Sequence, residues 1–358
     1  MLCPFHEGEE RIISHSIGAC SHCVRSDTVE MAKQTHDKLR RRDNLVPVIP
    51  STGEIVCSEC GNHCRMNEGE VGFCNIRIVK GGKVVDRYSD SAVVSWYFDP
   101  LPTNCVADWI CPVTTKRELG IGRTRFKNLA VFYGSCNSDC LFCQNASYRA
   151  MMAKGKPLMT AQELAEVADD YTACVCFFGG DSSCNPEHSV KTSKLLNDDR
   201  PVRVCYETNG NISKKWLDSI ADIVEVTGGT FKFDLKAVTP QIYQVLTGVS
   251  NTVVLRNFKK LATSKKDREG EFLVASILLV PGYIDIPEVA KICAFIAEND
   301  STIPTALLGF SPHHAMSDLP STSMAHAQAA LETANDQGLD NVRIGNKGLL
   351  GRDKYRFD

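Results

Sequence analysis

Residues 128–145 read Asn-Leu-Ala-Val-Phe-Tyr-Gly-Ser-Cys-Asn-Ser-Asp-Cys-Leu-Phe-Cys-Gln-Asn, and the rest of the chain is arranged around them. The first half is an apolar run typical of a buried strand. The second half carries Cys136, Cys140 and Cys143 in the spacing C-x3-C-x2-C. Three thiolates on one short loop suit three irons of a cubane [4Fe–4S] cluster, which leaves the fourth iron open for another ligand. Taken alone, the spacing also fits a structural zinc knuckle.

Length and charge restrict the classes of protein that this chain can form. Its 358 residues, 43% of them hydrophobic, can build one large domain of the barrel type and a smaller one. The net charge is -3, with 40 basic and 43 acidic residues, so we expect neither nucleic acid nor a membrane surface as a partner. The longest apolar run, residues 272–280, is too short to span a bilayer.

Cysteine is the unusual feature of the composition, with 17 residues. A disulfide scaffold would be secreted and usually short. The first ten residues have neither the basic start nor the apolar run of a signal peptide. We therefore expect a cytoplasmic, reducing and anaerobic setting in which the thiolates bind metals.

Residues 1–50 form a first Cys/His-rich segment with little apolar content. Such a segment usually needs a metal ion to fold. Cys3, Cys20 and Cys23 supply three ligands, and His6 or His15 is the candidate for the fourth. A zinc knuckle and a His-ligated cluster both fit this set, and a mobile polar loop is the alternative. A short charged helix is expected over 31–42, followed by an extended linker at 46–50.

Residues 51–98 form a second cysteine-rich module, with Cys57, Cys60, Cys64 and Cys74 in the spacing C-x2-C-x3-C-x9-C. Four thiolates within eighteen residues satisfy either a tetrahedral zinc ion or an auxiliary [4Fe–4S] cluster. The residues around Gly81-Gly82 alternate between apolar and polar side chains, which predicts a β hairpin.

A different pairing of these cysteines is also open. Cys20 and Cys23 together with Cys57 and Cys60 make two knuckles of zinc-ribbon type. Cys64 and Cys74 would then need other partners, and Cys105 and Cys111 are available. The latter pair lies in residues 99–127, which read as a long connector anchored by its few apolar residues.

From residue 128 to 358, strands and helices alternate at the interval of βα units. This pattern predicts a parallel sheet covered by helices, closed as a partial (βα)6 TIM-like barrel. Strands are expected at 129–133, 174–179, 202–207, 230–235, 272–280, 305–310 and 341–344. Helices are expected near 160–171, 186–196, 213–225, 240–262, 287–299 and 323–337.

Polar and glycine residues follow several of these strands. Functional groups of such folds gather at the carboxyl ends of the strands. The second strand ends in Gly179-Gly180-Asp181, the third in Glu207-Thr208-Asn209-Gly210, and the fourth in Asp234-Leu235-Lys236. The sixth ends before His313 and His314. A turn, a strand-end ion pair and structural histidines are the plain alternatives.

The cysteine loop with Phe142 before its last cysteine resembles the cluster loop of the radical S-adenosylmethionine (SAM) enzymes. Residues 55–346 are most similar to the branch of the pyruvate formate-lyase activating enzymes and the AmmeMemoRadiSam-type proteins. The resemblance implies that Phe142 flanks the adenine, that Gly179, Gly180 and Asp181 hold the amino group, and that Thr208, Asn209, Asp234 and Lys236 line the ribose and carboxylate end. It also gives Asp181, Lys236 and His313 as catalytic candidates, with His313 near the adenosine.

The resemblance implies an enzyme that cleaves SAM reductively and abstracts hydrogen from a protein or peptide, with glycyl-radical formation as the concrete version. A low-potential donor such as ferredoxin or flavodoxin would supply the electron. Modification of a small molecule or lipid is an alternative within this class. A non-catalytic iron–sulfur or zinc protein that carries electrons is the alternative outside it.

Overall fold

The computed structural model describes residues 3, 11–25, 30–101, 103, 105–115, 125–264 and 271–357. His6, a candidate fourth ligand of the first segment, lies outside these residues. The described chain is built on a nine-stranded, mostly parallel sheet in the order β13-β12-β11-β10-β9-β8-β6-β5-β7. Within the described residues the sheet has two free edges, so the expected partial barrel is confirmed and it does not close.

Seven strands of this sheet are parallel, and each lies within two residues of its predicted position. Their apolar, β-branched sequences suit a sheet that is buried on both faces. They are β6 (Lys127–Tyr133), β8 (Thr172–Phe178), β9 (Arg203–Thr208), β10 (Phe231–Asp234), β11 (Leu273–Leu279), β12 (Thr305–Gly309) and β13 (Val342–Gly345).

Two antiparallel strands extend the sheet beyond the predicted set. β5 (Ser91–Pro100) pairs with β6 along its whole length, and β7 (Leu158–Thr160) pairs with the start of β5. The sequence indicated a hairpin module up to residue 98, but most of β5 belongs to the main sheet. The alternation of strands and helices in the sequence predicts parallel strands, so it does not indicate an antiparallel edge strand.

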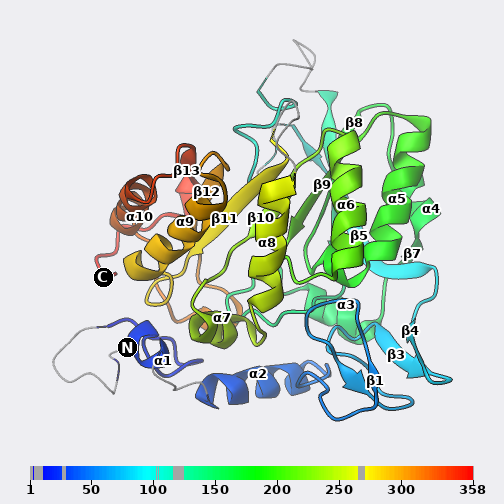
Figure 1. Ribbon diagram of the computed structural model, residues 1–358, viewed down its shortest axis with the longest axis horizontal. Helices are drawn as coiled ribbons and strands as arrows, with labels where there is room; N and C mark the ends of the chain where they lie inside the picture. The colour runs from blue at the N-terminus through cyan, green and yellow to red at the C-terminus, as the bar shows by residue number, and fades with distance from the viewer. Residues whose placement is uncertain are drawn as a thin grey trace.

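Helices cover the outer face of the sheet, as Figure 1 shows for α5, α6 and α8. The helices between the strands are α3 (Tyr148–Lys154), α4 (Ala161–Glu166), α5 (Pro186–Asp199), α6 (Lys214–Val226), α7 (Pro240–Thr247), α8 (Thr252–Ser264), α9 (Ile286–Asp300) and α10 (Met324–Asp336). The single helix predicted over 240–262 is wrong. Gly248 adopts a left-handed conformation (φ 72°) and ends α7, so α8 starts as a separate helix. Helix α3 was not predicted.

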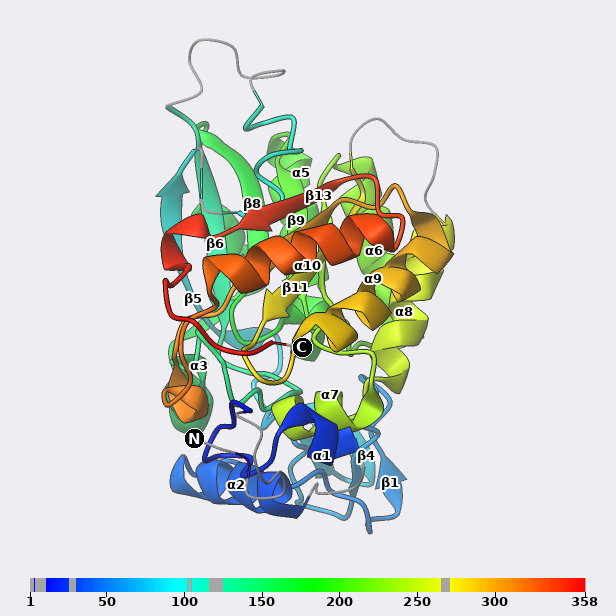
Figure 2. The ribbon, with the colours of Figure 1, turned by 90° about the vertical axis from the view of Figure 1, so that its left-hand side faces the viewer.

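The N-terminal third packs against the carboxyl ends of the parallel strands. It contains α1 (Ser21–Arg25), α2 (Glu30–Arg42), β1 (Ile55–Val56), β2 (Arg65–Met66) and the predicted hairpin, β3 (Arg77–Lys80) with β4 (Lys83–Asp86). Figure 2 shows α1 and α2 below the sheet, beside α7. No helix in the described part of the chain is long and apolar enough to cross a membrane.

Candidate functional site

The loop of residues 134–145, here called the cluster loop, leaves the carboxyl end of β6 and is anchored to α7. The backbone N–H of Asp139 donates to the carbonyl of Thr247 at 2.8 Å, and that of Leu141 donates to Leu246 at 2.9 Å. These bonds hold the loop so that Cys136, Cys140 and Cys143 line one cavity. The sequence prediction that the three thiols face a common space is consistent with this geometry.

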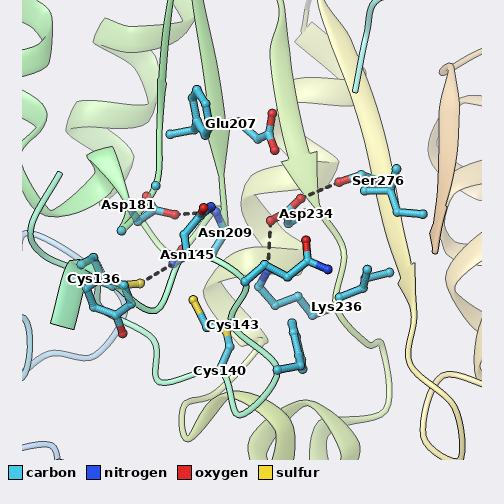
Figure 3. Close-up of a pocket in the computed structure, with 18 of the residues that line it drawn as sticks. Cys136, Cys140, Cys143, Asn145, Asp181, Glu207, Asn209, Asp234, Lys236 and Ser276 are labelled. Atoms are coloured by element: carbon cyan, nitrogen blue, oxygen red, sulfur yellow. Dashed lines mark hydrogen bonds and ion pairs between the residues drawn. The ribbon is translucent and has the colours of Figure 1, made fainter. Parts of the chain in front are cut away.

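This space, the triad cavity, has a volume of about 180 Å³. It lies over the carboxyl ends of β8, β9, β10 and β11, where the predicted polar residues emerge (Figure 3). Its walls include the following predicted and unpredicted side chains: Phe142, Gly179, Gly180, Asp181, Glu207, Asn209, Asp234, Lys236 and Ser276.

Gly180 has no room for a side chain. A Cβ there would lie 2.1 Å from the carbonyl oxygen of Tyr133 and 2.4 Å from that of Ser135, and its φ of 60° is left-handed. The turn that follows β8 therefore packs directly on the start of the cluster loop. The glycine pair singled out in the sequence therefore lets the turn after β8 pack closely against the loop that carries the three cysteines.

Asp181 is buried and organises the next strand end. Its carboxylate accepts from the backbone N–H of Asn209 at 2.7 Å, from Thr208 Oγ1 at 3.0 Å and from the N–H of Ser183 at 2.8 Å. Burial raises the pKa of Asp181, and these donors oppose the rise. Thr208 thus acts as a support for Asp181, and it is not among the residues that line the cavity.

Asp234, Lys236 and Ser276 form a charged group on the opposite wall, and Figure 3 shows both of its bonds. Lys236 Nζ donates to Asp234 Oδ2 at 3.0 Å, and Ser276 Oγ donates to Asp234 Oδ1 at 2.5 Å. Burial lowers the pKa of Lys236, but the neighbouring Asp234 and Cys140 outweigh it and raise the pKa overall. The lysine is therefore a protonated cation that faces the cluster loop.

Of the remaining predicted residues, Asn209 and Phe142 line the cavity and His313 does not. The amide nitrogen of Asn209 lies 2.9 Å from Asn137 Oδ1 and 3.8 Å from Cys136 Sγ, so Asn209 ties the strand end to the cluster loop. The ring centroid of Phe142 lies 5.7 Å from Lys236 Nζ. His313 is exposed and is not among the cavity-lining residues, so its role stays a prediction.

A buried carboxylate that the sequence analysis passed over stands behind the triad. Asp139 contacts Arg40 Nη1 at 3.3 Å, His36 Nδ1 at 2.8 Å and the guanidinium of Arg149. These partners keep its pKa below the usual range despite burial. The sequence of the loop contains this carboxylate, but two of its partners, His36 and Arg40, lie about a hundred residues away in α2. Arg149, the third, is in α3.

The second cysteine module contains an additional thiol. Cys57, Cys60, Cys64 and Cys74 line one small space of about 10 Å³ together with Cys184, which follows β8. The Cys184 thiol lowers the pKa of Cys74 to about 6 by hydrogen bonding. The four predicted ligands thus lie together, and the space among them is about that of one water molecule.

The N-terminal cysteines form a third group. The Sγ atoms of Cys3, Cys20 and Cys23 all lie within 4.8 Å of one another, and Cys3 and Cys23 are 3.9 Å apart. Tetrahedral zinc, with Zn–S bonds of about 2.3 Å, places its sulfurs roughly 3.8 Å apart. His15 instead bonds Asp318 at 2.8 Å.

The zinc-ribbon pairing of Cys20 and Cys23 with Cys57 and Cys60 is not what the structure shows. The first two cysteines lie with Cys3, and the other two lie with Cys64 and Cys74. Cys105 and Cys111 face a separate cavity over the sheet, because residues 105–115 fold across the inner face rather than toward the N-terminal module.

The chain is similar in sequence to several known proteins. Residues 130–296 match the model of the Radical SAM superfamily. An uncharacterized protein of Methanocaldococcus jannaschii is 26% identical over 310 residues, which cover 84% of this chain and 84% of that protein. The pyruvate formate-lyase 1-activating enzyme of Escherichia coli is 25% identical over 160 residues, 43% of this chain and 61% of that enzyme.

Solved structures show weaker likeness. A domain of pyruvate-formate lyase-activating enzyme from Bacteroides vulgatus is 20% identical, with a TM-score of 0.39 over 48% of this chain and 98% of that one. SuiB of Streptococcus suis, solved with S-adenosylmethionine, is 16% identical, with a TM-score of 0.46 over 62% of this chain and 51% of that one.

Proposed function

We propose that residues 130–296, which match the model of the Radical SAM superfamily, form a radical SAM domain, and that the triad cavity binds a [4Fe–4S] cluster and SAM. The protein then cleaves SAM reductively to a 5′-deoxyadenosyl radical, which takes a hydrogen atom from a substrate. One observation carries the proposal: a single cavity is lined by the three cysteines of one loop and by a lysine–aspartate pair from another strand.

The residues present fit both groups. Cys136, Cys140 and Cys143 offer three soft ligands on one wall, which suits a cubane with one open iron. The cavity of about 180 Å³ continues past the thiols to charged side chains that a small zwitterion requires. When bound, the cluster supplies the electron that breaks the carbon–sulfur bond of SAM.

The chain's own groups position the ligand. Lys236 stays protonated and offers a cation to a carboxylate, while Asp234 and Ser276 hold its side chain in place. Asp181 accepts three hydrogen bonds from the chain and faces the cavity, so it can accept a further one from an ammonium group. Phe142 offers an apolar ring beside Lys236 for the adenine.

For the substrate we infer a protein or peptide, with formation of a glycyl radical as the specific reaction. Support comes from the relationship to pyruvate formate-lyase 1-activating enzyme over 160 residues. A low-potential donor such as ferredoxin or flavodoxin in the cytoplasm provides the electron, and the site at Cys57, Cys60, Cys64 and Cys74 either relays it or anchors the partner.

A small-molecule substrate is the second candidate, and a neighbouring cavity favours it. This cavity has a volume of about 290 Å³, close to the lower end of typical ligand pockets, and it shares Phe178, Glu207 and Asn145 with the triad cavity. Arg343 and Asp108 line its other end, where they form an ion pair at 3.4 Å that a polar ligand could contact.

The decisive experiment measures 5′-deoxyadenosine after the anaerobically reconstituted protein is incubated with dithionite and SAM. We expect the nucleoside from the wild type and from Cys293→Ala, which alters a buried thiol in α9. None should form when Cys136, Cys140 and Cys143 are all alanine. If the wild type makes none at full iron occupancy, the proposal fails and the electron-carrier alternative replaces it.

A second measurement separates the two substrate classes. A lysate from cells grown in heavy water is divided by size into a protein fraction and a small-molecule fraction. Deuterium should enter 5′-deoxyadenosine with the protein fraction. Transfer from the small-molecule fraction alone would contradict the protein or peptide substrate and leave the radical chemistry intact.

A further inference from the structure

Five cysteines line a second cavity of about 180 Å³, here called the inner cysteine cavity: Cys105, Cys111, Cys174, Cys176 and Cys205. It lies toward the amino ends of β9 and β10, since Arg203 and Thr230 also line it. Buried cysteines are often small hydrophobic residues that fill a core. These thiols instead surround a space, which calls for a chemical explanation.

Strand geometry places three of the thiols on one patch. Cys174 and Cys176 are two residues apart in β8 and so point to the same face of the sheet. Cys176 pairs in register with Cys205 on the neighbouring β9. The three side chains therefore project together from adjacent strands.

The segment of residues 105–115 supplies the other two thiols from above. It folds as successive turns, in which the N–H of Asp108 donates to the carbonyl of Cys105 at 3.0 Å and that of Cys111 donates to Ala107 at 2.9 Å. These turns leave Cys105 and Cys111 facing the cavity that the strand cysteines line from below.

A buried lysine stands among the sulfurs. Lys232 Nζ lies 3.0 Å from Cys105 Sγ and 3.0 Å from Cys176 Sγ, and its side chain is 2% exposed. Glu207 Oε2 is 3.7 Å away. The ammonium group of Lys232 thus lies within hydrogen-bonding distance of one thiol from the covering segment and one from the sheet. Its positive charge would also offset the negative charge of a centre with several thiolates.

The cavity has room for more than one metal atom. A single water needs only about 10–15 Å³ of such volume, so about 180 Å³ leaves room for a larger group. Among the described residues, the only cysteines whose three sulfurs lie within 4.8 Å of one another are the N-terminal ones. The sulfurs of the inner cysteine cavity are more widely spaced, as are those of the triad.

From these observations we propose that Cys105, Cys111, Cys174, Cys176 and Cys205 provide the ligands of a further thiolate-bound metal centre, an iron–sulfur cluster, with Lys232 as its buried counter-charge. This centre is distinct from the sites at the triad and at the two N-terminal cysteine groups. Its cavity shares Phe178 and Glu207 with the triad cavity, so the centre adjoins the space in which a substrate would meet the radical.

The test counts metals and acid-labile sulfide in protein whose Cys136, Cys140 and Cys143 are alanine, so it does not depend on the proposed function. In this background, Cys105→Ser, Cys176→Ser and Cys205→Ser are combined. We expect the loss of about four irons and four sulfides per chain relative to the background. Cys293→Ala in the same background is the matched control and should lose none.

A second variant tests the proposal without any change in the strands of the sheet. Cys105→Ser combined with Cys111→Ser changes only the covering segment, and it should lower the bound iron and alter the visible absorption of the cluster. Loss of one zinc in place of iron would keep the thiolate centre and reject the cluster. Unchanged iron, sulfide and zinc in both variants, with circular dichroism like that of the background, would overturn the proposal.

Discussion

The carboxylate of Asp139 lies 2.8 Å from Nδ1 of His36, across 103 residues of chain. Asp139 is in the cluster loop, between two of its cysteines, and His36 is in α2. The other nitrogen of His36 lies 3.0 Å from the carbonyl of Val245 in α7. One buried imidazole thus joins the N-terminal segment, the cluster loop and the helix that supports that loop.

Replacing Asp139 with asparagine should strongly destabilise the protein. The change leaves the fully buried guanidinium of Arg40 without a carboxylate partner, and Arg149 keeps only Asp43 of its two carboxylates. Loss of one partner from a buried ion pair costs about 3–5 kcal/mol of unfolding free energy. Urea unfolding followed by circular dichroism measures it. Asp37→Asn, which removes an exposed partner of Arg41, is the control, and a similar loss in both variants would contradict the role of Asp139.

The stability of the fold should decrease between about pH 6.5 and pH 4, in part because of His326. Its imidazole is buried in α10, with Tyr355 at 3.1 Å and Asp285 at 3.8 Å, and burial lowers its pKa from 6.5 to about 4. Within this window the unfolded chain binds a proton at His326 and the folded chain does not, so stability is lost as the pH falls.

His326→Gln removes this titration, and the variant's urea midpoint should depend less on pH between 4 and 6.5 than the wild type's. His63, a histidine in a loop of the N-terminal module, is exposed, and His63→Gln is the matched control. An identical slope in wild type and His326→Gln would show that another group dominates the pH dependence.

Lys236→Met should weaken SAM binding roughly ten- to a hundredfold, because hydrogen bonds to charged groups contribute about 1.5–3 kcal/mol. Methionine keeps much of the length of the side chain and removes the charge that faces the cavity. Calorimetric titration of anaerobically reconstituted protein with SAM gives the affinity. Lys215→Met on α6 changes an exposed lysine and should bind SAM like the wild type. Equal affinities in all three proteins would remove Lys236 from the SAM site.

Gly180→Ala should be far more harmful than Gly338→Ala. Both glycines have positive φ, at 60° and 86°, so both substitutions pay a similar backbone strain. Only at Gly180 does the new Cβ meet backbone, 2.1 Å from the carbonyl oxygen of Tyr133, whereas nothing lies within 4 Å at Gly338. The difference between their urea midpoints isolates the clash, and equal midpoints would show that the turn after β8 can yield.

Combined substitution of Cys20 and Cys23 by serine should remove about one zinc per chain. The 3.9 Å separation of the Cys3 and Cys23 sulfurs suits ligands of one tetrahedral ion. Metal analysis after purification without added metal measures the loss, with Cys293→Ala as control. Loss of several irons instead of one zinc would indicate a cluster at this site.

Most of the sheet was predictable because each βα unit carries its own signal. β11 is an unbroken apolar run and α6 an amphipathic one, and neither needs distant residues to be recognised. The helix pair α7 and α8 was not separated, since Gly248 within an otherwise helical stretch is ambiguous until its left-handed φ is known. The sequence of the antiparallel edge strand β5 does not indicate which strand it pairs with.

The sequence by itself determined the cysteine spacing of the cluster loop and the order of the strand-end motifs, because both are written over a few neighbouring residues. Only the tertiary structure decided which distant groups share a space. It placed Asp139 against His36 and Arg40, Cys184 beside Cys74, and Cys105 and Cys111 with the thiols of β8 and β9. The physical reason is that burial and charge pairing act between side chains that are close in space, whatever their separation along the chain.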